Sequence, residues 1–137
     1  MSYLLDTNVI SELRKGERAD EKVRAWFSEV ADEEIYLSVL TLGEIRRGVE
    51  NVRRRDPDSA TALDGWLVRL GEAYGDRILS VDRAIAEEWG RMNVPDPLPV
   101  VDGLLAATAK VLGLTFATRN VADVEKTGMK LIDPFSV

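Results

Sequence analysis

Five short, mainly apolar runs recur along the chain, at residues 3–5, 35–39, 78–81, 114–117 and 130–132. Runs of this length, bounded by polar and turn-forming residues, are typical of buried strands. Between these runs the apolar residues recur every three to four residues, which is the period of a helix. The pattern therefore predicts five strands separated by helices.

The helical period is clearest at residues 20–30, where Val23, Trp26, Phe27 and Val30 stand at positions i, i+3, i+4 and i+7. This spacing produces the apolar stripe of an amphipathic helix that packs on a sheet. Similar patterns predict further helices at residues 9–13, 41–54, 59–74 and 101–112, and one that starts after Asp82.

Capping residues mark several of the predicted helix ends. Thr41 and Asp82 are expected to be N-caps, because short oxygen-bearing side chains accept hydrogen bonds from free N–H groups. Gly16 and Gly113 are expected to end their helices, since glycine adopts the left-handed conformation of a C-cap. These residues mark where the predicted helices begin or end.

Strands that alternate with helices pair in parallel through right-handed crossovers. We therefore predict an α/β fold, a three-layer α/β/α domain with a central, mainly parallel sheet of about five strands. The prediction covers residues 1–137 as a single domain. The proline-rich segment 94–99 interrupts helical structure and is expected to be a loop beside the functional site.

Four acidic residues, Asp6, Glu44, Asp102 and Asp123, each follow a short apolar run, where a strand gives way to a helix. They are too far apart in sequence for a local motif. A parallel α/β sheet brings the carboxyl ends of its strands together at one edge, where ligands bind. The pattern therefore makes a metal site at that edge a plausible hypothesis.

A simpler interpretation is that Asp6, Asp102 and Asp123 only cap helices. Asp82 occupies an equivalent place and is interpreted as a cap alone, so it serves as an internal control. Glu44 differs because Gly43 and Gly48 flank it inside a predicted helix, and each glycine weakens a helix by about 1 kcal/mol relative to alanine. Close approach of another backbone or of a ligand explains these glycines, and so does loose packing at the surface.

Composition removes competing chemistries. The chain has no His and no Cys, which excludes Ser-His-Asp triads, thiolate nucleophiles, imidazole bases and Cys/His zinc sites. Carboxylate oxygens prefer hard cations, so the acidic residues indicate Mg²⁺ or Mn²⁺. With 24 acidic and 18 basic residues the net charge is −6, which argues against gripping long duplexes by charge alone.

The remaining sequence features concern location and surface. The N-terminus has no basic region before an apolar stretch, and no segment is long enough to cross a membrane, so a soluble, cytoplasmic protein is expected. Arg46 and Arg47 lie on the helix that carries Glu44. They are interpreted either as a solvated face or as possible contacts for RNA or an acidic partner.

With these residues in view, the chain resembles the PIN-domain ribonucleases, specifically the VapC-type toxins of toxin–antitoxin pairs. The resemblance covers nearly the whole chain. It rests on residues 4–13 (LLDTNVISEL), 37–45 (LSVLTLGEI), 102–109 (DGLLAATA) and 114–120 (LTFATRN), followed by Asp123. Many relatives carry a Gly-Arg-Pro type of sequence before the acidic residue that corresponds to Asp102. Residues 93–100 lack it, so RNA contacts or the entry to the site are expected to differ.

The resemblance implies a ribonuclease that uses Mg²⁺ or Mn²⁺, forms a homodimer and is inhibited by a cognate VapB-like antitoxin. We predict Asp6 and Asp102 as direct metal ligands. Glu44 and Asp123 are predicted to bind through water, hold a second ion or position the attacking water. Thr118 and Asn120 are predicted polar helpers.

Two other functions remain open from the sequence. Residues 4–7 (LLDT) also resemble the nucleophile strand of haloacid-dehalogenase-type phosphatases, with Asp6 as nucleophile, although Asn8 stands where those enzymes usually carry a second Asp. The other alternative is a non-catalytic module that binds a protein partner, in which the acidic residues are caps.

Overall fold

Strands and helices alternate along the computed structural model, which describes all residues from 1 to 137. The strands are β1 (Tyr3–Leu5), β2 (Ile35–Ser38), β3 (Ile78–Leu79), β4 (Thr115–Ala117) and β5 (Leu131–Ile132). The helices are α1 (Thr7–Leu13), α2 (Glu21–Glu29), α3 (Val39–Arg53), α4 (Pro57–Tyr74), α5 (Arg83–Met92), α6 (Val100–Leu112) and α7 (Val121–Val124).

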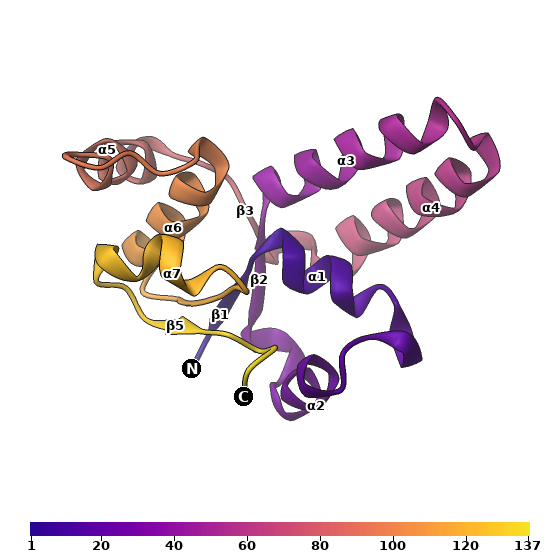
Figure 1. Cartoon of the computed structure of the whole chain (residues 1–137), viewed down its shortest axis with the longest axis horizontal. Coiled ribbons are helices and arrows are strands. Elements are labelled where there is room, and N and C mark those ends of the chain that lie inside the picture. The colour runs from indigo at the N-terminus through magenta and orange to yellow at the C-terminus, as the bar shows by residue number, and fades with distance from the viewer.

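All five strands pair in parallel, in the order β3-β2-β1-β4-β5. Helices α1 to α4 cover one face of this sheet, and α5 to α7 cover the other (Figure 1). The prediction of a three-layer α/β/α fold with a parallel sheet of five strands is confirmed. Because β1 lies in the middle of the sheet, its carboxyl end opens at the centre of the sheet edge.

The sheet separates two hydrophobic cores. Leu5 and Ala117 face the core built with α1 to α4, whereas Leu4 and Phe116 face the core built with α6 and α7. Successive residues of a strand point to opposite faces, so each central strand contributes to both cores. This double burial explains why the strands are continuous apolar runs in the sequence.

The start of α3 differs from the prediction. The helix begins at Val39, and its cap is Ser38, whose Oγ accepts a hydrogen bond from the Leu40 N–H at 3.0 Å. Thr41 lies inside the helix and is fully buried. The prediction that Thr41 caps this helix was wrong, because β2 ends one residue earlier than the apolar run and both Ser38 and Thr41 are chemically suitable caps.

Several other boundaries were displaced. Helix α1 ends at Leu13, and Gly16 lies in the following turn with φ of +61°. Strand β3 comprises only Ile78–Leu79, shorter than the apolar run at residues 78–81, because it forms the edge of the sheet and pairs on one side. Helices α1 and α4 each begin two residues earlier than predicted, at Thr7 and Pro57, because Asp6 and Asp56 are their N-caps. The Asp82 cap of α5 and the Gly113 C-cap of α6 agree with the prediction.

The glycines beside Glu44 have no close neighbours. A Cβ atom built on Gly43 or Gly48 would meet no atom within 4 Å, apart from the adjoining residues and the backbone of the helix. Close approach of another backbone of this chain is therefore the wrong explanation for these glycines. By contrast, a Cβ on Gly103 would lie 3.1 Å from Cδ1 and from Nε1 of Trp89, so α6 packs tightly on α5 beside Asp102.

These surroundings predict opposite effects for two glycine-to-alanine substitutions. Gly43→Ala is expected to raise the free energy of unfolding by about 0.5–1 kcal/mol, because alanine favours the helix and finds open space. Gly103→Ala is expected to lower it by roughly 1 kcal/mol, since overpacking against Trp89 outweighs the gain in helix propensity. Urea unfolding of both variants checks the prediction, which is wrong if Gly103→Ala is the more stable of the two.

No helix is both long and apolar enough to pass through a membrane.

Candidate metal centre at the carboxyl edge of the sheet

Asp6 directly follows β1 and caps α1. Its Oδ1 accepts a hydrogen bond of 2.7 Å from the Thr7 N–H, and its Oδ2 accepts one of 3.3 Å from the Asn8 side-chain amide. Only 5% of Asp6 is exposed. The capping interpretation is therefore correct for Asp6, although capping alone does not require such burial. It was wrong for Asp102 and Asp123, which lie inside α6 and α7 and cap neither helix.

The end of β4 supplies a third hydrogen bond to Asp6. Thr118 donates from Oγ1 to Asp6 Oδ2 at 2.7 Å, and Thr118 itself is 1% exposed. The Asn120 backbone N–H donates to the same Thr118 oxygen at 3.0 Å. Thr118 therefore contacts the Asp6 carboxylate, whereas Asn120 reaches it only through its backbone N–H and Thr118. The role of both residues as polar helpers stays a prediction.

Glu44 approaches the same edge from α3. Its carboxylate accepts a short hydrogen bond from the Thr7 hydroxyl, and this hydroxyl also lies 3.2 Å from Thr41 Oγ1. Glu44 sits in the second turn of the helix that follows β2, which carries it back over the end of β1. Because Thr7 directly follows Asp6, this hydrogen bond holds the Glu44 carboxylate close to the end of β1.

The charges of the acidic residues act on one another. Burial raises the pKa of Asp6, and the negative charges of Asp102 and Glu44 raise it further, against the lowering effect of the hydrogen bonds from Thr118 and Thr7. Burial also raises the pKa of Asp102, with added contributions from Glu44 and Asp123. The fold thus brings Asp6, Glu44 and Asp102 within mutual electrostatic reach.

Asp123 is at the margin of this group. It lies in the short helix α7, its side chain is exposed, and its charge acts on Asp102. Asp102 is the third residue of α6, where the helix dipole partly offsets the repulsion between these carboxylates. We call Asp6, Glu44, Asp102 and Asp123 the acidic cluster.

The acidic cluster contains no cationic side chain. None of its four members takes part in an ion pair within the chain. Burial of a carboxylate without a positive partner is unfavourable, and like charges nearby increase the penalty. A divalent cation removes both penalties, and its preferred ligands are the oxygen atoms that the cluster provides.

The carboxylates are not already drawn together as ligands. No three acidic side chains converge closely enough to form a ready-made metal site. Thr7 donates a hydrogen bond to Glu44, and Thr118 donates one to Asp6. The oxygen atoms of the cluster therefore suit a hard cation by their chemistry, although no three of the side chains converge on one point.

Sequence reasoning overlooked two contributors to the cluster. Thr7 was not predicted as a site residue, yet its hydroxyl donates a hydrogen bond to Glu44. Asn8 donates to Asp6 and accepts a 3.3 Å hydrogen bond from the Arg119 N–H, which ties α1 to the end of β4. The available signal was their position directly after Asp6, since residues at the end of a central strand face the same edge.

Arg46 and Arg47 differ in their surroundings. Arg46 contacts Asp64 of α4 at 2.8 Å and Glu50 of α3 at 3.3 Å, so it joins the two helices. Arg53 makes a similar bridge to Asp64. Arg47 is exposed and forms no ion pair with another residue of the chain. Of the two predicted contacts, Arg47 is the one whose charge is available to a partner.

The Thr118 hydroxyl provides a test of pH dependence. Its hydrogen bond lowers the pKa of Asp6, so Thr118→Val is expected to raise that pKa and leave less ionised Asp6 at mildly acidic pH. If the ionised form is needed for RNA cleavage, the acidic limb of the pH–rate profile moves to higher pH. Thr118→Ser retains the hydroxyl and is expected to keep the original limb, and equal profiles for both variants would refute the assignment.

The chain is similar in sequence to known proteins. A family model described as the PIN domain matches residues 3–125. VapC ribonuclease Y4jK of Sinorhizobium fredii is 33% identical over 139 aligned residues, which cover 96% of each chain. Toxin FitB of Neisseria gonorrhoeae is 30% identical, with 96% of this chain and 97% of FitB covered.

A solved structure gives the same result in three dimensions. The crystal structure of FitAcB from Neisseria gonorrhoeae superposes with a TM-score of 0.89 at 30% identity, covering 98% of this chain and 99% of the other. The sequence matches and the shared fold both extend over nearly the full chain. This chain belongs to the PIN-domain family, with VapC-type proteins among its relatives.

Proposed function

We propose that this protein is a metal-dependent ribonuclease and the toxin of a toxin–antitoxin pair. The observation that carries the proposal is Asp6, a buried carboxylate that faces the charges of Asp102 and Glu44 with no cationic side chain among them. The names of its relatives, a VapC ribonuclease and a toxin, support RNA cleavage as the activity. RNA as substrate also favours the cytoplasm as the location.

Asp6 and Asp102 are the residues proposed to hold Mg²⁺ or Mn²⁺ directly. When bound, such a cation supplies Lewis-acid chemistry, since it lowers the pKa of water and offsets the charge of a phosphodiester. Thr118 and Asn8 orient the Asp6 carboxylate through their hydrogen bonds. Because these hydrogen bonds already hold the carboxylate in place, it loses less conformational entropy when a cation binds.

Glu44 and Asp123 are assigned to the attacking water or to an outer position. Thr7 donates a hydrogen bond to Glu44 next to the end of β1, and the chain has no His. Both observations support a role for Glu44 in orienting a water or accepting its proton. Asp123 is exposed, which suits contact through water or with a second ion. Both roles use the oxygen acceptors that this chain provides.

A groove next to Glu44 supports an antitoxin as partner. It has a volume of about 240 Å³ and runs between α1, α3 and α4, with Ser11, Arg14, Leu63, Trp66 and Glu44 among its lining residues. A lining that combines apolar side chains with one acidic and one basic residue fits a helix or extended segment that presents apolar residues and charges of both signs. The proposal also includes the homodimer expected from the resemblance, which light scattering of the purified protein tests.

The phosphatase alternative loses its support. The family match extends over residues 3–125, far beyond the four residues that suggested a dehalogenase-type enzyme. Asn8 also donates its amide to Asp6, so the position that would carry a second catalytic Asp serves instead to fix the first. A non-catalytic binding module remains the outcome to be distinguished by experiment.

The test is cleavage of total RNA by the purified protein after removal of its partner. With Mg²⁺ or Mn²⁺ present we expect fragments with defined ends, and with EDTA we expect none. Cleavage that persists in EDTA contradicts the metal assignment. Intact RNA under every metal condition, together with a stable protein complex, would establish the binding module.

A further inference from the structure

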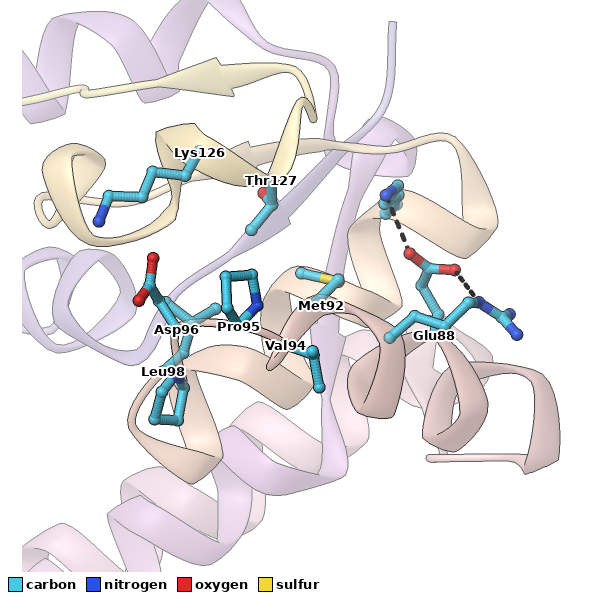
Figure 2. A pocket seen from close by; sticks show the side chains of 11 residues that line it. Glu88, Met92, Val94, Pro95, Asp96, Leu98, Lys126 and Thr127 are labelled. Atoms are coloured by element: carbon cyan, nitrogen blue, oxygen red, sulfur yellow. Dashed lines mark hydrogen bonds and ion pairs between the residues drawn. The ribbon is translucent and has the colours of Figure 1, made fainter.

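A second pocket lies between the loop that leads into α6 and the turn that follows α7. It has a volume of about 530 Å³, within the range of roughly 300–1,000 Å³ typical of ligand sites. Figure 2 shows Lys126 and Thr127 on one side of it and Pro95, Asp96 and Leu98 on the other. We call this space the loop pocket.

Both walls of the loop pocket are formed by segments that directly adjoin members of the acidic cluster along the chain or at the start of α6. Leu98 on the loop packs at the start of α6, where a Cβ on Gly103, the neighbour of Asp102, would lie 3.5 Å from its Cβ. On the other wall, Lys126 and Thr127 belong to the short 3-10 helix of residues Glu125–Thr127, which directly follows α7 and Asp123. An RNA strand that crosses the acidic cluster therefore passes beside the loop pocket.

The loop pocket is locally basic in an acidic protein. Its lining includes three cationic side chains, Arg91, Lys110 and Lys126, and two carboxylates, Glu88 and Asp96. Glu88 is engaged by both Lys110 at 2.9 Å and Arg91 at 3.1 Å, as the dashed lines in Figure 2 show. Lys126 forms no ion pair within the chain and is exposed, so its full charge is available to an anion.

The walls are not uniform. Met92, Val94, Pro95 and Leu98 give an apolar surface on the side of the loop, while the ammonium group of Lys126 comes from the opposite side. An apolar face opposite a cation fits a nucleotide, whose base packs on the first and whose phosphate binds the second. The segment that departs from the usual family pattern, residues 93–100, thus forms one wall of a pocket suited to RNA.

We propose that the loop pocket binds the RNA strand on one side of the scissile phosphate, with Lys126 as a phosphate contact. The inference rests on the proposed ribonuclease function and names a substrate subsite for it. RNA is favoured over a protein segment because most of the lining is polar or charged and the positive charge adjoins a cluster that repels anions. Asp96 opposes phosphate binding and limits the affinity of the pocket.

Two charge changes with matched controls test the subsite. Lys126→Glu is compared with Lys22→Glu, which makes the same change beside Tyr3 and Trp26, at the amino end of β1 and away from the acidic cluster. Asp96→Asn is compared with Asp82→Asn, an exposed helix cap outside the loop pocket. Each pair has the same net charge, so general attraction or repulsion of RNA is equal within a pair.

The probe is a fluorescently labelled oligouridine, bound at low salt to the Asp6→Asn protein that carries each charge variant. Relative to Lys22→Glu, we expect Lys126→Glu to raise Kd about tenfold and to lower the slope of log Kd against log salt by about 0.7, the value for one phosphate of a single strand. Asp96→Asn is expected to bind more tightly than Asp82→Asn. In the protein with Asp6 restored, Lys126→Glu is expected to raise the KM for RNA and to leave the rate of cleavage at saturating RNA unchanged.

Equal Kd values for Lys126→Glu and Lys22→Glu overturn the subsite, and so does failure of the Asp6→Asn protein to bind oligouridine at low salt. Loss of antitoxin binding in Lys126→Glu with unchanged RNA affinity assigns the loop pocket to a protein partner instead and also overturns it. All three outcomes leave metal-dependent cleavage intact, whereas failure of the proposed function appears as the absence of that cleavage.

Discussion

Asp6→Asn is expected to reduce RNA cleavage by at least about a hundredfold while the protein stays folded. Loss of a residue that only supports a metal ligand lowers affinity or activity roughly 10–100-fold, so loss of the ligand itself has at least that effect. The change keeps the size and the capping oxygen of the side chain, and Asn is as good an N-cap as Asp. The hydrogen bond from the Thr7 N–H can therefore persist.

The same substitution is expected to stabilise the protein in the absence of divalent cations. Burial and the charges of Asp102 and Glu44 raise the pKa of Asp6, so the ionised form is disfavoured in the folded state. The contribution of Asp6 to stability is fully present below the pKa that this carboxyl has in the unfolded chain. It is lost as pH rises from that value through the higher pKa of Asp6 in the folded state. The advantage of Asp6→Asn over the unmodified protein should therefore grow as pH rises through that window.

Asp82→Asn is the matched control for both effects. Asp82 also follows a strand and caps a helix, with its Oδ1 accepting from the Ile85 N–H at 2.9 Å, but it is exposed and outside the acidic cluster. We expect unchanged cleavage and a change in stability within about 0.5 kcal/mol. Similar losses of cleavage in Asp6→Asn and Asp82→Asn would mean that helix capping, not metal binding, explains the junction residues.

Mg²⁺ or Mn²⁺ is expected to raise the melting temperature of the unmodified protein. A ligand at roughly 100 times its Kd stabilises the folded state by about 2.7 kcal/mol. For a chain of this length, 1 kcal/mol shifts Tm by about 2–4 °C, so the expected rise is roughly 5–10 °C. Differential scanning calorimetry in EDTA and in Mn²⁺ measures it directly.

Two variants determine whether that rise comes from the acidic cluster. Asp6→Asn and Asp102→Asn should each lose most of the rise, because each removes a proposed ligand and part of the repulsion that the cation relieves. Asp82→Asn should retain it. An equal rise in all four proteins would show that the cations act at some other site.

The sequence was sufficient for the architecture because the relevant signals are local. Strands such as β1 and β4 are buried on both faces, so they appear as continuous apolar runs, and α2 shows its buried stripe at Val23 and Trp26. Residues directly after parallel strands face one edge by necessity. Asp6 could therefore be assigned to this edge from the strand pattern, whereas Thr118, which follows the neighbouring strand β4, was assigned to the same site through the family resemblance.

Other features depend on contacts between distant segments, which no local pattern records. Ser38 and Thr41 are equally suitable caps, and the choice between them depends on where β2 stops pairing with β1 and β3. The hydrogen bond between Thr7 and Glu44 joins residues 37 positions apart. The bridge from Arg46 to Asp64 depends on how α3 and α4 fold back on each other.

The central claim is that the acidic cluster binds a divalent cation between Asp6 and Asp102. Crystals of the protein grown with Mn²⁺ test it most directly, through anomalous scattering at the metal absorption edge. We predict a strong anomalous peak coordinated by oxygen atoms of Asp6 and Asp102, and its loss in Asp6→Asn. A well-ordered cluster without a peak, or a peak bound only by residues elsewhere, would contradict the account.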